Sequence, residues 1–264
     1  FFAMASAQAK ETLTERMRRS TRRVHAESDR IVNVKLAVCF AHRPLYGEAI
    51  ALFYPIYAAL EEAAERQRDH PLLAPLYPFI KAMARTPRFE QDIAFFLGTC
   101  DTHRLQARRP AALEEYLQRL DRLQQEEPGL LVPYFYHMYM AIMAGGSLIK
   151  KAARRAMGLH GDEGTAIFDF DASVNKAELR TAFKEAINSL DVPPDLLEQL
   201  LEEGGHVFAN NNRVVASLAM APEYTAAKAY VIRGLLRYGL WVGAVAIAAM
   251  ALWKARGVRP AGAA

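Results

Sequence analysis

The chain has 264 residues, of which 52% are hydrophobic and 23% charged, and its formal net charge is +4. This length allows one large domain or two small ones. So small a net charge does not support nucleic-acid binding, and we expect no nucleic-acid partner. The two cysteines, Cys39 and Cys100, give neither a disulfide framework nor metal-ligand spacing. We expect both to be buried apolar residues in a reducing or neutral compartment.

The first segment of the chain is expected to lie outside the folded domain. Residues 1–11 are predicted to be an N-terminal extension, either a processed mature end or the start of an incomplete sequence, because the chain begins at Phe1 rather than methionine. Thr12 and Glu15 then have the spacing of a capping box, which predicts a helix from there to about Arg30.

The rest of the chain up to residue 222 is almost entirely periodic at the helical spacing. Leu52, Ile56 and Leu60, for example, recur every four residues. The pattern predicts helices over 43–67, 89–97, 110–125, 130–157 with an interruption at Gly145-Gly146, 174–190, 193–203 and 205–220. Alternating strand patterns are nearly absent, so the predicted fold class is all-α, with one multi-helix domain over 12–222.

Two apolar stretches are long enough to cross a bilayer. The stretch 130–149 has no formal charge, but its tyrosines, proline and glycine pair favour a buried core helix. The run from Tyr238 to Trp253 is uninterrupted, has arginines before it and basic residues after it, and carries a tryptophan near each end. It predicts one C-terminal transmembrane helix, with an anchor over 223–256 and a short basic tail over 257–264. The membrane is expected to be mitochondrial or that of the endoplasmic reticulum, which the sequence does not separate.

One column of side chains stands out near the N-terminus. Arg18, Arg22, His25 and Asp29 are spaced by four, three and four residues, so they share one face of the predicted helix. A neutral imidazole is a good axial ligand for heme iron, and arginine suits the carboxylates of heme. Asp29 is placed to accept the other ring N–H of His25 and orient it. A structural histidine on a solvated basic helix face is the alternative.

The segment from Tyr134 to Lys151 contains the adjacent glycines Gly145 and Gly146. Each glycine costs a helix about 1 kcal/mol relative to alanine, so such a pair indicates a kink or the close approach of another body. A flat macrocycle fits this space, and so does a tightly packed neighbouring helix.

With these segments, the sequence resembles the heme oxygenase family over about 11–219. Thr21–His25 resembles the family's proximal helix, and six further motifs follow in family order. They are Tyr57–Glu62, His70–Tyr77, Phe89–Phe95, Glu127–Leu131 and Gly145-Gly146-x-x-x-Lys-Lys151, with Asn188–Leu190 after them. Some members of that family carry a C-terminal membrane anchor.

The resemblance implies that heme b lies between a proximal and a distal helix and that His25 ligates its iron. It further implies heme contacts from Arg18, Thr21, Arg22, Asp29, Arg180, Lys184 and Phe208. Active members use O₂ and a reductase to convert heme to biliverdin, carbon monoxide and ferrous iron.

The distal helix departs from the family pattern. Ile142 stands where active members carry an aspartate, Ala141 replaces a glycine that lies against the heme, and Met138 replaces a common arginine. Gly145 and Gly146 match, as do four residues of the distal polar network: Tyr57, Tyr116, Tyr136 and Asn211. No catalytic residue is therefore predicted to be intact at the centre of the network.

Ring opening needs a proton delivered to bound oxygen, and a positioned group typically contributes 10²–10⁴-fold. Isoleucine neither donates nor accepts a proton, and its bulk excludes water. We therefore expect a membrane-anchored, heme-binding protein with lost or weak cleavage activity, serving a membrane protein assembly as a heme-binding or structural subunit. One alternative is an active heme oxygenase with a rearranged water chain through His137 or Tyr136. Another is a heme-free interaction scaffold.

Overall fold

The computed structural model describes residues 11–101, 109–161, 163–219 and residue 233. The chain divides into two compact units, residues 1–219 and 220–264. The elements below belong to the first unit, and every regular element among its described residues is helical. The predicted all-α class is therefore confirmed for this part of the chain.

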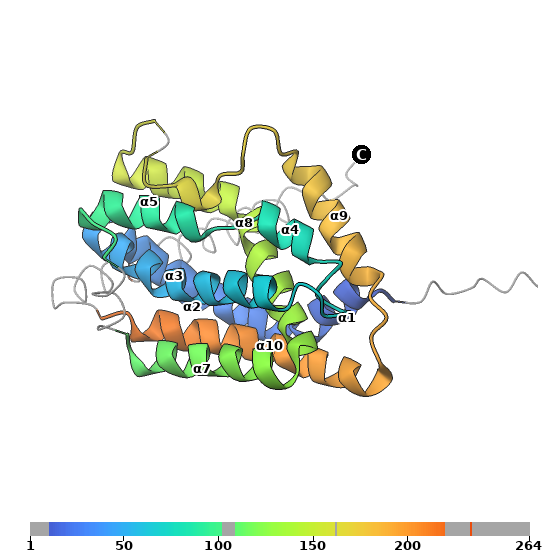
Figure 1. Ribbon diagram of the computed structural model, residues 1–264. Helices are drawn as coiled ribbons and strands as arrows, with labels where there is room; N and C mark the ends of the chain where they lie inside the picture. The colour runs from blue at the N-terminus through green and yellow to red at the C-terminus, as the bar shows by residue number, and fades with distance from the viewer. Residues whose placement is uncertain (1–10, 102–108, 162, 220–232, 234–264) are drawn as a thin grey trace, which may run out of the picture. The chain divides into compact units, whose positions relative to one another are not determined.

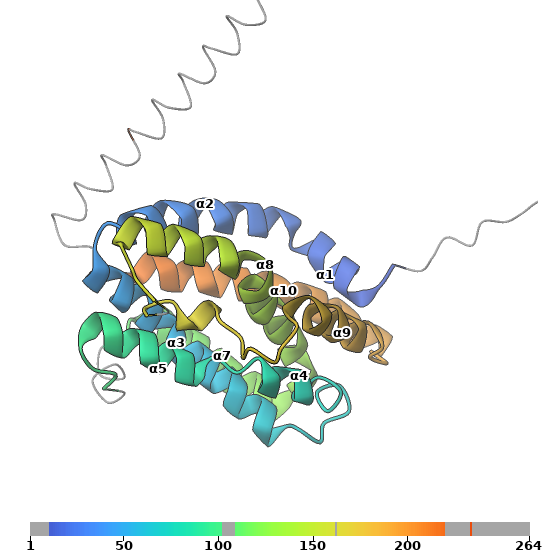
Figure 2. The ribbon, with the colours of Figure 1, turned by 90° about the horizontal axis from the view of Figure 1, so that it is seen from above.

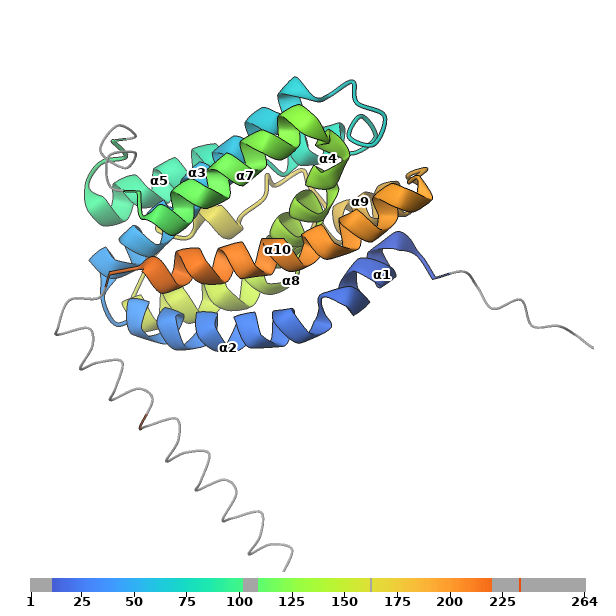
Figure 3. The same cartoon turned by 90° about the horizontal axis from the view of Figure 1, so that it is seen from below.

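The helices form one bundle (Figure 1). The elements in chain order are α1 Leu13–Ser20, α2 Arg22–Cys39, α3 Arg43–Arg66, α4 Tyr77–Ala82, α5 Thr86–Leu97, α7 Ala111–Glu126, η1 Pro128–Leu131, α8 Val132–Met157, η2 Ala166–Phe168, α9 Lys176–Asn188 and α10 Pro194–Ser217. α10 contacts α1, α2, α7 and α8, and it crosses the bundle between α7 and α2 (Figure 3). α3 packs on α5 and α7. α10 thus connects the N-terminal helices to the rest of the core.

The core is rich in aromatic side chains from α3, α7 and α8. Tyr46, Tyr116, Tyr134, Phe135 and Tyr139 are all at most 1% exposed. Each such side chain contributes on the order of 1.5–3 kcal/mol through removal of apolar surface from water. The segment 130–149, predicted to be a core helix, therefore supplies much of the interior. Among the described residues, the structure has no helix with the length and hydrophobicity that a bilayer span needs.

The predicted first helix, to about Arg30, is wrong in two respects. The structure has two helices that meet at Thr21, and the second continues to Cys39. The hydroxyl of Thr21 donates a hydrogen bond of 2.7 Å to the carbonyl of Met17, four residues earlier. Such back-bonding bends helices. The helix continues beyond Arg30 because its last turn packs into the core, where Val38 and Cys39 are fully buried.

The two glycine pairs do not end their helices. α8 stays α-helical through Gly145-Gly146, although it bends along its length (Figures 1 and 2). α10 is one helix through Gly204-Gly205, where two helices were predicted. At Gly204 an added Cβ would lie 3.1 Å from the Thr21 side chain, so the absence of a side chain permits close packing there. Packing against neighbours therefore outweighs the low helix propensity of glycine.

Three predicted segments lie outside the described residues, apart from Glu11 and Arg233: the extension 1–11, the anchor helix 223–256 and the basic tail 257–264. The short helix α4 was not predicted at all, because six residues are too few to display helical periodicity.

Candidate functional site

The imidazole of His25 lies in the first turns of α2 with most of its surface open to solvent. Its Nδ1 is 3.1 Å from Oδ2 of Asp29, one turn later on the same helix. When Nδ1–H donates to this carboxylate, the Nε2 lone pair is left available to a metal. The His25 side chain is 55% exposed, so Nε2 can be reached by a ligand that enters from solvent.

A second imidazole lies close to His25. The ring of Phe208, from α10, is 5.1 Å from the ring of His25 and 4.9 Å from the ring of His137. Nε2 of His137 is buried and has no hydrogen-bond partner in the part of the chain that the structure describes. Burial lowers the pKa of His137 to about 3, and the positive charge of nearby His25 adds to the effect. His137 is therefore a neutral imidazole at physiological pH.

The four basic residues expected to surround carboxylates are all exposed: Arg18, Arg22, Arg180 and Lys184. The pKa of Glu15 is lowered, first by its hydrogen bonds with Thr12 and also by the charges of Arg18 and Lys184. The structure therefore brings α1 and α9 together at one end of the site. A hydrogen bond of 2.9 Å from the Thr14 amide to Asn188 Oδ1 joins the two helices there. Arg22 begins α2, and Arg180 lies near Lys176 on α9.

One face of α8 is apolar and uncovered by other described residues. Ala141 and Ala144 are exposed, and Leu148 is 75% exposed, more than any other large hydrophobic residue described. A Cβ added to Gly145 would meet no atom of the described residues within 4 Å, whereas one added to Gly146 would lie 3.0 Å from Cδ1 of Phe168. The second glycine is therefore needed for packing within the protein, and the first leaves space on the uncovered face.

The polar residues expected around the distal helix are brought together only in part. The hydroxyl of Tyr57 donates to the carbonyl of Met138 at 3.0 Å, and Nδ2 of Asn211 contacts the sulfur of Met138 at 3.3 Å. The Tyr136 hydroxyl is instead directed at the carbonyl of Thr14, at 3.5 Å. The buried Tyr116 hydroxyl finds no hydrogen-bond partner among the residues that the structure describes. Tyr57 and Asn211 therefore both contact Met138, one at its backbone carbonyl and the other at its sulfur, and neither contacts a carboxylate.

Ile142 lies one turn after Met138 on α8 and is half-buried. Its side chain has no atom that accepts or donates a hydrogen bond. Position 142 of α8 therefore offers no polar side-chain atom.

A buried carboxylate that the sequence did not single out lies next to the site. Glu203 of α10 accepts hydrogen bonds from Arg119 at 2.7 and 2.5 Å and from the Tyr134 hydroxyl at 2.5 Å. Its side chain is 5% exposed. The sequence signal that could have found it is its spacing. Glu203 lies three residues after Leu200 and four before Val207, and both of these residues are fully buried, so it falls on the buried face of the helix. Its partners are 84 and 69 residues away in sequence, so the pairing needed the structure.

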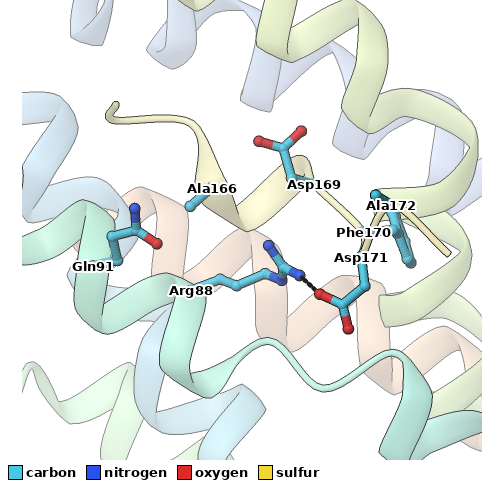
Figure 4. A pocket seen from close by; sticks show the side chains of 7 residues that line it. All are labelled: Arg88, Gln91, Ala166, Asp169, Phe170, Asp171 and Ala172. Atoms are coloured by element: carbon cyan, nitrogen blue, oxygen red, sulfur yellow. Dashed lines mark hydrogen bonds and ion pairs between the residues drawn. The ribbon is translucent and has the colours of Figure 1, made fainter. Parts of the chain in front are cut away.

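A polar cavity of about 430 Å³ lies beside α5 and η2, and Figure 4 shows its lining residues. They are Arg88, Gln91, Ala166, Asp169, Phe170, Asp171 and Ala172. Arg88 is paired with Asp171 at 2.5 Å, and Asp169 with Lys150 at 2.5 Å. Its charged lining groups are already neutralised in pairs, and it contains none of the residues predicted to form a site.

Comparison with known proteins identifies similar chains. Residues 11–217 match the family model described as heme oxygenase. The chain is 31% identical to heme oxygenase 2 of Macaca fascicularis over 214 residues, which are 79% of this chain and 66%, just under two thirds, of that protein. The fold is similar to heme oxygenase 2 of Chlamydomonas reinhardtii, solved without heme, with a TM-score of 0.75 and 29% identity over 80% of this chain and 100% of the other. It is also similar to heme oxygenase-1 of the cyanobacterium Synechocystis, solved in complex with heme. The TM-score is 0.71, and the identity is 26% over 85% of this chain and 99% of that one.

Proposed function

The chain belongs to the heme oxygenase family, and from this premise we propose that it is a membrane-anchored heme-binding protein whose ring-opening activity is lost or weak. The observation that carries the proposal is the pairing of His25 with Asp29 beside an apolar α8 face on which position 142 is isoleucine. The first feature supports heme binding, and the second opposes turnover.

The residues present fit a heme group. His25 offers Nε2 to the iron, and Asp29 orients the ring through Nδ1. Gly145 leaves space on the α8 side, and the exposed apolar residues around it suit the face of a macrocycle. Exposed Arg18, Arg22, Arg180 and Lys184 are available for the two propionates, which arginine binds with paired hydrogen bonds. Thr21 packs against Gly204 of α10, and Phe208 of the same helix lies against the His25 ring. When bound, heme supplies the iron at which O₂ reacts.

The α8 side chains determine what this chain can do with protons near that iron. Active members need a group there that holds a water molecule and relays a proton, and such a group is typically worth 10²–10⁴-fold in rate. Ile142 offers no polar atom, while Tyr57 and Asn211 are engaged with Met138. The extra methyl of Ala141 also narrows the approach to the helix backbone. We therefore expect slow ring opening or none.

The role in a membrane assembly rests on the C-terminal sequence. The apolar run Tyr238–Trp253, with basic residues on both sides, supports an anchor in the mitochondrial or endoplasmic reticulum membrane. A protein that keeps the fold and cofactor of an enzyme without its turnover suits a heme-binding or structural subunit, with protein partners in that membrane. If the chain is active instead, a reductase is a required partner.

The test is a titration of the full chain with hemin, followed at the Soret band. We expect saturable binding that is lost or weakened at least tenfold in His25→Ala. The exposed histidine His160 provides the matched control, and His160→Ala should bind as the parent does. Absence of saturable binding to the parent would instead support the heme-free scaffold.

The loaded protein is then supplied with a reductase system and O₂, and biliverdin formation is measured. We expect little product from the parent and a large gain from Ile142→Asp, because the carboxylate restores a group that holds water. Fast turnover by the parent, little changed in Ile142→Asp, would show an active heme oxygenase. The buried neutral imidazole of His137 is the observation that favours this second function, since it is a polar group near the pocket.

A further inference from the structure

Ser28 is a buried polar residue in the middle of α2, the helix that carries His25. The buried residues of this helix are Ser28, Val38 and Cys39, and the last two belong to its final turn. Ser28 is 7% exposed, whereas every other residue of α2, His25 included, is exposed or half-buried. Fully buried apolar side chains therefore anchor only the end of the helix, and in the part from which His25 projects the buried residue is a serine.

The buried hydroxyl of Ser28 binds the helix on which α2 packs. Its Oγ donates a hydrogen bond of 2.7 Å to Oδ1 of Asn212, a residue 184 positions later in the chain. Asn212 belongs to α10, and α2 packs chiefly on α10 (Figure 3). A hydrogen bond is directional, so this one favours a single rotation of α2 about its own axis, whereas apolar contacts allow several.

The bond lies in line with the contacts of His25. Each contact here is about one helical turn from the next along both partners, so they share one face of α10. The three contacts are Thr21 with Gly204, His25 with Phe208, and Ser28 with Asn212. The residue after Ser28 is Asp29, the carboxylate that orients the His25 ring. A rotation of α2 that breaks the bond would therefore move both His25 and Asp29 relative to Phe208.

We propose that Ser28 and Asn212 are positioning residues for the heme ligand, and that their hydrogen bond holds α2 in the orientation in which His25 faces the iron. This inference rests on the proposed heme binding. Asp29 belongs to the same helix as His25, so its bond cannot fix the ring relative to the rest of the protein. The Ser28–Asn212 bond can, because it joins two helices. A helix held in the binding orientation before heme arrives needs none of the binding energy to reach it.

The first test compares the hemin affinity of the full chain with that of Ser28→Ala, Asn212→Ala and the double variant. Without the bond, part of the heme-free protein has α2 in other orientations, so each single variant should bind hemin about threefold to tenfold more weakly, the range expected for the loss of one ordinary hydrogen bond. The double variant should bind as the single variants do, because the two residues act through one bond.

Two further variants serve as controls. Asn212→Asp keeps an oxygen that accepts the Ser28 hydroxyl, so it should bind hemin with nearly the affinity of the parent. Ser217→Ala removes a hydroxyl that donates at 2.8 Å to the carbonyl of Val214 within α10. That bond joins no two helices, so its loss should leave hemin affinity unchanged.

The second test is spectroscopic, because a loss of stability alone would not alter the bond between His25 and the iron. The iron–histidine stretching band of the ferrous protein, measured by resonance Raman spectroscopy, depends on the strength and geometry of that bond. We expect the band to shift or broaden in Ser28→Ala and Asn212→Ala. It should match the parent in Asn212→Asp and Ser217→Ala.

The outcomes separate this inference from the function on which it rests. If hemin binding is lost in His25→Ala, but Ser28→Ala and Asn212→Ala change neither the affinity nor the stretching band, the positioning role alone is overturned. A parent with no saturable hemin binding overturns the positioning role and the proposed function together. If Ser28→Ala does not fold, judged by circular dichroism, Asn212→Ala removes the same bond at a half-buried position and decides the question.

Discussion

At the scale of single residues, the charged groups in and beside the site differ in how much they matter to the fold. Both side chains of the His25–Asp29 pair are exposed to solvent, so the pair adds little to the stability of the fold and is available for binding. Glu203 is the opposite case, because it is buried and holds Arg119 and Tyr134 together across three helices. Glu203 changes the pKa of both partners. Its hydrogen bond raises the pKa of the Arg119 guanidinium. Burial, and then the nearby charge of Glu203, raise the pKa of the Tyr134 hydroxyl.

We predict that Glu203→Gln lowers the free energy of unfolding by about 1–3 kcal/mol, because the amide cannot form the paired, charged hydrogen bonds with Arg119. Chemical denaturation measures the change. The matched control is Glu115→Gln, since Glu115 pairs with Arg213 at 2.8 Å but both side chains are more than half exposed. That control should change stability by less than about 1 kcal/mol. Equal effects of the two substitutions would contradict the assignment of Glu203 as a buried structural carboxylate.

At the scale of elements, α8 combines two functions in one helix. Its buried side, with Tyr134 and Tyr139, forms part of the core, and its other side, with Ala141, Ala144 and Leu148, is not covered by other described residues. The two glycines fall on different sides of this division. Gly146 faces Phe168, and Gly145 faces space.

This difference predicts opposite results for two neighbouring substitutions. Gly145→Ala should raise the free energy of unfolding of the heme-free protein by about 0.4–1 kcal/mol, because alanine restricts the unfolded chain and meets no neighbour. It should also weaken hemin binding about tenfold, the equivalent of about 1.4 kcal/mol, because the methyl occupies space on the heme side. Gly146→Ala should not stabilise the protein, since its Cβ would crowd Phe168.

Gly205→Ala on α10 is the control for this pair. An added Cβ there also meets no atom within 4 Å, so it should stabilise the heme-free protein as Gly145→Ala does while leaving hemin binding unchanged. Hemin affinity that is equal in Gly145→Ala and Gly205→Ala would place the macrocycle elsewhere.

At the scale of the whole molecule, the chain joins a helical unit over 1–219 to a second unit over 220–264. We predict that the full chain partitions into lipid vesicles, whereas residues 1–219 alone stay in the aqueous phase and still bind hemin. The physical reason is that an apolar run of the length of Tyr238–Trp253 gains more from the bilayer interior than from water. Vesicle flotation measures the partition, and recovery of the full chain in the aqueous phase would refute the anchor.

Much of the fold was predictable from the spacing of apolar residues. Helices α3, α7 and α9 begin and end within about two residues of their predicted bounds, because amphipathic periodicity is a local property of the sequence. The errors fall where distant contacts decide the outcome. Thr21 divides the first predicted helix, and Gly204-Gly205 lies inside a continuous one because it packs against Thr21.

The sequence by itself determined the all-α class, the family, and the side chains offered to a ligand, since His25 and Asp29 lie one turn apart and need only a helix to meet. Only the tertiary structure decided which groups surround them. Phe208 contacts two imidazoles, Glu203 binds Arg119, and Tyr57 and Asn211 both contact Met138, and in each case the partners are far apart in the chain. The spacing of residues along one helix determines which side chains share a face. The packing of helices determines which faces come into contact, and no local sequence pattern predicts that.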